Sequence, residues 1–389
     1  MKKAAFQGIS INIILLGIIS FLNDASSEMI IPILPLFITS LGGTGLIIGL
    51  IGGLRDSISS LLKVICGFWS DKTGKRKIFV LSGYLTSALF KLLLSFSTIW
   101  QQVLISSSLE RVGKGIRTAP RDAIIADSMP ERRGKGFGIH RALDTFGAIL
   151  GSLMVFILIW FIVLDYNTII FIAAIIAFFS LIPLLLVKER RRGKQIISFK
   201  VSLRNLSKPL KIFLFVSGIF SLGNFSYMFF ILRAQSFFSG EWSIVAPILL
   251  YVLFNIFYAL FAIPFGSLSD KIGRKTVLFS GYLLFAVTSL GFAFFSLLPG
   301  FIVLFALYGI VYAILDGNQR ALVADLSSEQ LRSTALGTYH TIIGMMALPS
   351  SLIAGFIWEI VNPTVTFLVG GIFSLLAFMV FLLFKRHFS

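Results

Sequence analysis

Charged side chains stand inside stretches of the sequence that are otherwise apolar. Asp24 and Glu28 interrupt the first of these stretches, and their spacing of four places both carboxyl groups on one face of a helix. Because an ionised group in hydrocarbon costs at least ~2.5 kcal/mol, such groups line a polar cavity or pair with one another. Burial and a like-charged neighbour both favour the protonated form of a carboxyl group, which suits reversible proton transfer. Asp24 and Glu28 are therefore candidate proton carriers; alternatively, each is paired with a basic residue of a neighbouring helix and stays ionised.

A later stretch carries one acid and four basic residues, most of which recur at helical spacing along one stripe. Glu110 and Arg111 are further candidates for proton coupling, and we favour a functional role for Arg111, which lies deeper in this stretch. Arg117 and Arg121 lie near its end. There they are expected to clamp Asp71, a carboxylate at the point where an earlier helix leaves the membrane.

Other polar side chains in the apolar stretches are candidates for lining a solute pathway. Buried cations outnumber buried acids, which keeps an anionic solute open as an alternative to a drug-like one. Tyrosines in the second half of the chain offer aromatic faces and hydroxyl groups, although single tyrosines in helices commonly serve packing. The candidate cavity residues are Asp24, Arg55, Arg111, Lys114, Asn224, Arg233, Tyr251 and Asp316.

Twelve apolar runs must position these groups. Hydrophobic residues make up 57% of the chain and charged residues 13%, against about a quarter in soluble domains, which indicates a polytopic membrane protein. A membrane-spanning helix needs roughly 20 apolar residues. Pro32 and Pro35 are expected to bend the first helix near its end. The expected helices are 9–38, 44–70, 78–97, 102–119, 136–164, 167–187, 212–237, 244–268, 276–298, 300–325, 334–360 and 364–384.

The loops between these runs differ in charge. One set contains clusters of Lys and Arg, whereas the other contains Asp165 and Glu241 and no basic residue. The formal net charge of +17 is therefore an orientation signal rather than a sign of nucleic-acid binding. We expect a multi-pass protein of the plasma membrane with both termini in the cytoplasm and the first run retained as a helix, not cleaved as a signal peptide.

One loop sequence is repeated half a chain later. The run G-F-W-S-D-K-T-G-K-R-K at 67–77 returns as G-S-L-S-D-K-I-G-R-K at 266–275. Their aspartates, Asp71 and Asp270, are 199 positions apart, which indicates an internal duplication. In each copy the first glycine allows two helices to approach closely, the aspartate can bind backbone groups or an arginine, and the next glycine suits a left-handed turn. The latch residues, as we call them, are Gly67, Asp71, Gly74, Arg76, Gly266, Asp270, Gly273 and Arg274.

The duplicated loop resembles the signature loop of the major facilitator superfamily, which occurs between helices 2 and 3 and again between helices 8 and 9. The resemblance implies an all-α polytopic membrane protein with twelve transmembrane helices in two pseudo-symmetric six-helix bundles. With the long hydrophilic segment 188–211 as a basic cytoplasmic linker, the bundles are 1–187 and 212–389. The resemblance also implies a substrate site contributed by helices 1, 4, 7 and 10, and transport by alternating access.

Two shorter motifs resemble other signatures of the same family. R-V-G-K-G at 111–115 resembles the R-x-x-x-G signature of helix 4, whose arginine is associated with proton transfer in that family. G-A-I-L-G-S at 147–152 resembles the G-x-x-x-G-P signature associated with antiporters, but Ser152 stands where proline is expected, which leaves the direction of transport open. The alternative for the second motif is ordinary helix packing through small residues.

These observations predict a secondary active transporter that moves a small solute across the plasma membrane by alternating access, coupled to protons, and exports a drug-like or metabolite compound. The first alternative is a proton-coupled permease or symporter for an anionic metabolite; the second is a non-transporting membrane receptor or an enzyme. The sequence contains no nucleophile motif, metal-ligand cluster or nucleotide-binding loop, and its one cysteine, Cys66, excludes an internal disulfide. We therefore expect no enzymatic activity, no cofactor and no metal. The expected partners are the solute, protons and the lipid bilayer, with no nucleic acid, and the protein is expected to be a monomer.

Overall fold

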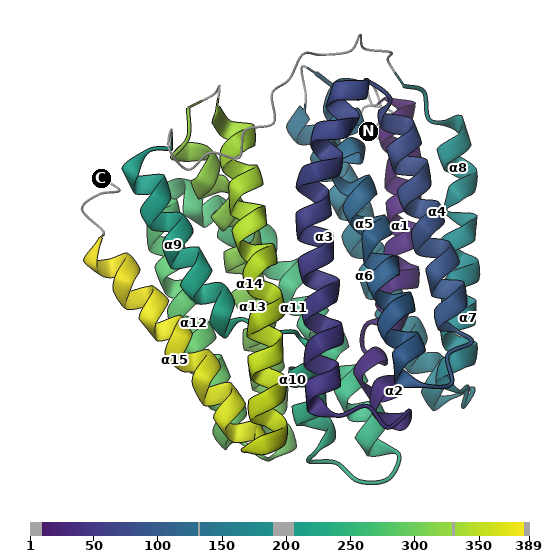
Figure 1. Ribbon diagram of the computed structural model, residues 1–389, viewed down its shortest axis with the longest axis vertical. Coiled ribbons are helices and arrows are strands. Elements are labelled where there is room, and N and C mark those ends of the chain that lie inside the picture. The colour runs from purple at the N-terminus through teal and green to yellow at the C-terminus, as the bar shows by residue number, and fades with distance from the viewer. Residues whose placement is uncertain (1–9, 131–132, 190–205, 329–330, 385–389) are drawn as a thin grey trace, which may run out of the picture. The chain divides into compact units, whose positions relative to one another are not determined.

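A computed structural model describes residues 10–130, 133–189, 206–328 and 331–384. Every regular element in these ranges is a helix, as Figure 1 shows. The chain divides into two compact units, one formed by residues 1–33 and 61–199 and the other by residues 34–60 and 200–389. Helix α3 (Gly45–Thr73) passes from the second unit into the first, so each unit is described with its own part of that helix.

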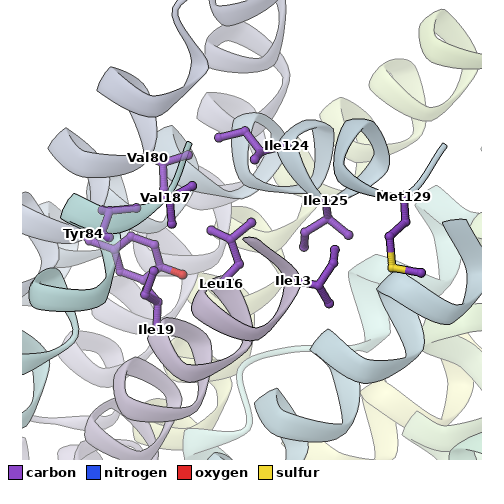
Figure 2. Close-up of a cluster of buried hydrophobic side chains, with 10 residues drawn as sticks. Ile13, Leu16, Ile19, Val80, Tyr84, Ile124, Ile125, Met129 and Val187 are labelled. Atoms are coloured by element: carbon purple, nitrogen blue, oxygen red, sulfur yellow. The ribbon is translucent and has the colours of Figure 1, made fainter. Parts of the chain in front are cut away.

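The first unit is built from long helices that pack side by side (Figure 1). Its other helices are α1 (Ile11–Ile30), α4 (Arg76–Leu94), α5 (Trp100–Ser128), α6 (Arg133–Trp160), α7 (Tyr166–Phe179) and α8 (Leu181–Leu186). Ile13, Leu16 and Ile19 recur at helical spacing on α1, where they meet Tyr84 of α4 and Ile125 of α5 (Figure 2). All five side chains are buried. Packing of this kind, rather than exclusion from water, holds helices together in a bilayer.

The second unit is richer in aromatic contacts. Its other helices are α2 (Leu34–Ser40), α9 (Lys208–Gly223), α10 (Met228–Gln235), α11 (Trp242–Ile272), α12 (Arg274–Phe294), α13 (Leu298–Asp325), α14 (Arg332–Ile360) and α15 (Pro363–Leu383). Phe230 of α10 stacks on Tyr308 of α13 at 4.1 Å between ring centroids and meets Phe292 of α12 edge-on at 5.0 Å. These rings fix α10 against α12 and α13.

The two units repeat one pattern of helix packing. In the first unit α1 packs against α6 and α7, and α4 packs against α5 and α7. In the second unit α9 packs against α14 and α15, and α12 packs against α13 and α15. The same neighbours therefore recur in chain order, which extends the duplication from the loop sequence to the helices.

Three of the expected helices are interrupted, and the one expected at 167–187 is divided at Ser180 into α7 and α8. The first stops at Ile30 and resumes as α2 at Leu34, which confirms the bend predicted from Pro32 and Pro35. Residues 224–227 separate α9 from α10. Their freed backbone groups find side-chain partners: the Ser351 hydroxyl accepts from the Ser226 N–H at 3.1 Å.

Eleven helical segments in the described ranges are long and apolar enough to span a membrane, judged by length and composition. The expected helix 102–119 is the exception. It is present as α5, which has 29 residues but carries too many charges to meet the same standard. Its predicted end at residue 119 is wrong, because the helix continues through Pro120 to Ser128. The arrangement of exactly twelve spanning helices in two bundles therefore stays a prediction.

Some expectations concern residues that the structure does not describe. Most of the expected linker 188–211, at 190–205, lies outside the described residues, and so do the first nine residues. The described end of the linker is helical, since α9 begins at Lys208. Packing groups residues 34–60 with the second unit. The expected boundaries at 187 and 212 concern the order of halves along the chain and remain a prediction.

Candidate functional site

Two residues of the first latch, Asp71 and Arg76, form an ion network with Asp127. Arg76 donates through Nη2 to Asp71 at 2.5 Å and through Nη1 to Asp127 at the end of α5 at 2.7 Å. The Arg76 side chain is 13% exposed and that of Asp127 is 19% exposed, whereas that of Asp71 is 41% exposed, so the arginine and Asp127 are the shielded part of the network. The backbone N–H groups of Arg76 and Lys77, at the start of α4, donate to the Glu189 carboxylate. One carboxylate network therefore connects the ends of α3, α4 and α5 with the segment after α8.

The second latch has the same three positions. Arg274 contacts Asp270 at 3.2 Å and Asp325, at the end of α13, at 2.5 Å. Here the Asp270 side chain is 64% exposed and that of Asp325 is 52% exposed. Asp127 and Asp325 were not among the sequence-predicted residues. They are 198 positions apart, within one position of the 199 that separate Asp71 from Asp270, and this spacing is the signal that could have identified them.

The latch glycines behave differently in the two copies. Gly74 and Gly273 have positive φ angles of 66° and 91°, which confirms the predicted left-handed turn after each helix. A Cβ on Gly67 would lie 3.0 Å from the Ala119 Cβ, as expected for a close approach of α3 and α5. Among the described residues, nothing lies within 4 Å of the same position on Gly266. Gly67 therefore lies at a close approach of two helices of its unit, whereas the position of a Cβ on Gly266 is open among the described residues; close helix approach at Gly266 stays a prediction.

A cavity of about 260 Å³ lies beside the first latch. It is lined by latch residues and by the starts and ends of the surrounding helices. Asn12, at the start of α1, helps to close it: its side-chain N–H donates to the Lys188 carbonyl at 2.7 Å, and its amide oxygen accepts from the Lys188 N–H. The end of α8 is thus tied to α1 next to the ion network.

The basic residues of α5 do not bind the latch. Arg117 is 3% exposed, donates to the Ser87 hydroxyl at 2.5 Å and lies 4.4 Å above the Tyr84 ring. Arg121 pairs with its neighbour Asp122 at 2.9 Å. The prediction that Arg117 and Arg121 clamp Asp71 is therefore wrong. Asp71 instead forms an ion pair with Arg76 of its own loop. Arg117 and Arg121 lie within helix α5, which continues past Pro120, and bind groups inside the unit.

The deeper charges of α5 lie in the interior of the first unit. Glu110 and Arg111 are 4% and 7% exposed and form an ion pair at 3.3 Å. Lys91 of α4 is 1% exposed and donates to the Ser26 and Ser27 hydroxyl groups of α1, each at 2.9 Å. The interior of this unit therefore holds charges that are bound by other polar groups of the protein.

A polar cluster around the buried Ser20 and Asp144 joins α1, α5 and α6. Ser20 of α1 donates to one oxygen of Asp144 at 2.6 Å, and Arg141 donates to the other at 2.9 Å. Ser20 also accepts a bond from Arg121 at 3.3 Å. The Asp24 carboxyl group faces that of Asp144 within hydrogen-bonding range. Asp24 is therefore part of an organised polar cluster, and Asp144 is a member that sequence reasoning did not place with it.

The second unit holds a cluster of tyrosines with one carboxylate. Tyr258 donates to Asp316 at 3.0 Å, and Asp316 pairs with Arg320 one helical turn away at 2.7 Å. The hydroxyl groups of Tyr308 and Tyr312 are 3.4 Å apart. The group can offer aromatic faces, phenol groups and a negative charge to a ligand.

The remaining cavity candidates of the second unit have varied surroundings. Asn224 lies in the break between α9 and α10 and contacts the Tyr312 hydroxyl. Tyr251 is 6% exposed and packs against Phe254. Arg233 binds the carbonyl oxygens of Phe292 and Ala293 at 2.9 and 2.8 Å, at the end of α12. Arg233 thus neutralises a helix C-terminus.

Two further candidates, Arg55 and Glu28, are buried and partly buried, respectively. Arg55, in the part of α3 that belongs to the second unit, is 3% exposed. Glu28 is partly buried one turn beyond Asp24 on α1. Both engage in interactions within the protein.

Outside the spanning segments, Asp165 begins helix α7. Its carboxylate accepts from the Thr168 hydroxyl at 2.6 Å and from the Thr168 N–H at 3.1 Å. These bonds favour the ionised form and hold the pKa of Asp165 below its ordinary value. Asp165 is a helix cap with no part in the buried clusters.

Comparisons with known proteins agree with this architecture. The family model described as "Major Facilitator Superfamily" matches residues 16–246 and 213–388. An uncharacterized MFS-type transporter of Methanocaldococcus jannaschii is 57% identical over 373 residues, which cover 95% of this chain and 94% of that protein. The multidrug resistance protein MdtG of Enterobacter lignolyticus is 34% identical over 141 residues, 34% of this chain and 33% of its own.

Among solved structures, a point mutant of the nucleoside transporter NupG has a TM-score of 0.81 at 16% sequence identity. The alignment covers 96% of this chain and 99% of that one. At this identity the likeness concerns the fold. The family match, in contrast, extends over nearly the whole sequence and includes the duplicated loops. The chain belongs to the major facilitator superfamily.

Proposed function

We propose that this protein is a secondary active transporter that exports a small organic solute, drug-like or metabolite, by alternating access and in exchange for protons. The observation that carries the proposal is the polar cluster around the buried Ser20 and Asp144, which Asp24, Arg121 and Arg141 complete within a membrane-spanning unit. A passive bundle gains nothing from such a cluster, because each buried charge must be compensated. A transporter that binds and releases protons needs it.

Proton coupling is supported by the chemistry of Asp24. A carboxyl group beside a second carboxyl group, in partly apolar surroundings, can exist protonated as well as ionised. Movement of helix α1 would change which cations lie near the Asp24 carboxyl group, and would thereby change the proton affinity of that group. Glu28, Glu110 and Arg111 remain further candidates for coupling, and Arg111 stands on the segment that resembles the family's helix 4 signature.

Export of an organic compound is supported by two separate observations. The partial relative MdtG carries the name multidrug resistance protein, although it matches only 34% of this chain. The tyrosines around Asp316 in the second unit offer aromatic faces with a nearby negative charge, which suits aromatic or cationic compounds.

A second candidate function is proton-coupled uptake of an anionic metabolite. It is favoured by the basic residues of α5, where Arg111 and Lys114 stand one turn apart. Under this alternative an anionic solute competes with the transported compound, and Arg111→Ala raises its apparent binding constant. Competition by cations alone, unchanged in Arg111→Ala, favours a cationic export substrate instead.

The wider setting belongs to the same proposal. We infer twelve spanning helices, a location in the plasma membrane with both termini in the cytoplasm, and a monomer without a cofactor. Cysteine labelling of single-cysteine variants in a Cys66→Ser background tests the orientation. The cysteine of Glu241→Cys should react only with reagent added outside the cell, and the cysteine of Lys208→Cys only with reagent that reaches the inside.

Purified protein in proteoliposomes tests the function. Compounds that raise the unfolding temperature are selected first, because a ligand that binds only the native state stabilises it. We expect such a compound to cross the membrane chemically unchanged and to be concentrated when a pH gradient is imposed. A bound compound that is chemically altered, or that never crosses, contradicts the proposal.

A further inference from the structure

We propose that Asp24 and Asp144 share a single exchangeable proton between helices α1 and α6, and that this pair is the proton-binding site of the transporter. The inference rests on the proposed proton coupling and assigns it to one place. It adds Asp144, a residue of α6, to the single carrier expected on α1.

The arrangement of donors and acceptors around the two carboxyl groups favours a shared proton. An ionised carboxylate can only accept hydrogen bonds. Ser20 and Arg141 already donate to the two oxygens of Asp144, at 2.6 and 2.9 Å. The Asp24 carboxyl group faces Asp144 within hydrogen-bonding range as well. Two acceptors can bond to each other only if one of them carries a proton.

The surroundings assign the proton to Asp24. Asp144 is 9% exposed and holds both a hydroxyl donor and a guanidinium donor, which stabilise its ionised form. The side-chain bond to Asp24 comes from the neighbouring amide of Asn23 at 3.4 Å, which is a weaker donor. The resting state is therefore a protonated Asp24 that donates to an ionised Asp144.

The packing of α1 against α6 keeps the two carboxyl groups together. A Cβ on Gly147 would overlap the Phe21 carbonyl oxygen, and a Cβ on Gly151 would overlap that of Ala25. The two backbones are therefore in direct contact along the segment that carries Asp24 and Asp144. The contact explains the small residues of the motif at 147–152, because Gly147 and Gly151 allow α6 to pack closely against α1. It also means that loss of the proton leaves two facing negative charges that cannot easily move apart.

Other charged groups surround the pair from several helices. Helix α6 also contributes His140, which is 4% exposed and whose Nε2 has no hydrogen-bond partner in the described part of the chain. Its unused nitrogen is a candidate next acceptor for the proton. The charged or titratable neighbours are Lys91 on α4, Lys114, Arg117, Arg121 and Asp122 on α5, and His140 and Arg141 on α6.

Infrared difference spectroscopy on the full-length protein in lipid nanodiscs tests the pair. The signal is the carbonyl stretch of a protonated carboxyl group, identified by its shift when H₂O is replaced by D₂O. We expect the band to be lost in Asp24→Asn and also in Asp144→Asn, because either substitution removes the shared proton. The double variant should lose no more than either single one. Glu241→Gln, an exposed residue at the start of α11, should leave the band unchanged.

Two outcomes would overturn the pair. A band that is lost in Asp24→Asn and retained in Asp144→Asn means that Asp24 is protonated on its own. Additive losses in the double variant mean two independent protons.

A milder variant covers the case in which Asp144→Asn does not fold. Ser20→Ala removes one donor from Asp144 and should shift the band, whereas Ser152→Ala should not. Ser152 is a matched buried serine of α6 that bonds to the backbone of its own helix. An unshifted band in Ser20→Ala also contradicts the proposal.

Transport in the same preparations separates this inference from the proposed function. If the wild type accumulates solute on a pH gradient while Asp144→Asn does so equally well, the pair is wrong and proton coupling stands. If the wild type ignores the pH gradient, proton coupling itself fails, and the pair is then not a transport site whatever its spectrum. Loss of gradient-driven accumulation in both single variants, together with loss of the band, supports both.

Discussion

The two latches contain the same Asp–Arg–Asp network in different surroundings. Arg76 joins Asp71 of its own loop to Asp127 at the end of α5. Arg274 joins Asp270 of its own loop to Asp325 at the end of α13. The exposed fraction of the arginine side chain is 13% in the first latch and 28% in the second. An ion pair contributes more as water is excluded from it. The pairing is therefore the same in both copies, and we expect the more buried first copy to contribute more to stability.

The largest difference is expected for the two loop aspartates in transport. Asp71→Asn should abolish or strongly reduce transport without blocking membrane insertion, because it removes one of the two carboxylates that pair with the largely buried Arg76. Asp270→Asn should have a smaller effect, since Asp270 is 64% exposed and water can replace it as a partner of Arg274. Solute uptake by proteoliposomes with equal protein content measures both. If both variants transport solute at the wild-type rate, neither loop aspartate is needed for transport.

A stability comparison follows for the two arginines. Arg76→Gln leaves Asp71 and Asp127 without their cation and should lower the free energy of unfolding by roughly 1–3 kcal/mol. Arg274→Gln should cost only ~0–1 kcal/mol, the range of exposed ion pairs. Thermal unfolding in detergent at low and high salt measures the difference. The comparison breaks down if Arg274→Gln destabilises the protein as much as Arg76→Gln does.

Glu189 gives the first latch an additional connection. Its carboxylate accepts from the first backbone N–H groups of α4, where a negative charge is favourable. Glu189→Gln keeps the shape and removes the charge, so we expect a loss of ~0.5–1 kcal/mol, reduced further in high salt. A salt-independent effect would show that the contact acts through shape alone.

The smallest expected effect concerns the latch glycines, and its sign should differ between copies. Gly67→Ala pushes a methyl group against Ala119 and should destabilise the protein. Gly266→Ala enters open space and should stabilise helix α11 by about 0.5–1 kcal/mol, the difference in helix propensity. Thermal unfolding of the two variants measures both effects. Equal shifts of the unfolding temperature in the two variants would refute the difference in packing.

The duplication allowed much of this fold to be predicted from the sequence. Repeated spacing located the loops, their glycine turns and the helices on either side, because loop chemistry and apolar runs are local properties. The end of α5 was misplaced because Pro120 and the charged residues around it are typical of a helix end. Those charges are tolerated because they bind one another and buried hydroxyl groups inside the unit.

The buried site was harder to predict. Asp24 could be singled out by its apolar surroundings along the chain. Its neighbour Asp144 is 120 positions away and meets it only because Gly147 and Gly151 let α1 and α6 touch. The binding of Arg117 to Ser87 and Tyr84 likewise depends on the packing of α4 against α5. Such contacts are set by tertiary packing, which local spacing does not determine.

The central claim is that a proton on Asp24 drives transport, and one proteoliposome experiment with imposed pH and solute gradients tests it most directly. Asp24→Asn mimics the protonated state permanently. We predict that it abolishes accumulation driven by the pH gradient and retains exchange of solute down its own gradient, because exchange needs conformational change but no net proton movement. Gradient-driven accumulation that survives in Asp24→Asn would contradict the claim.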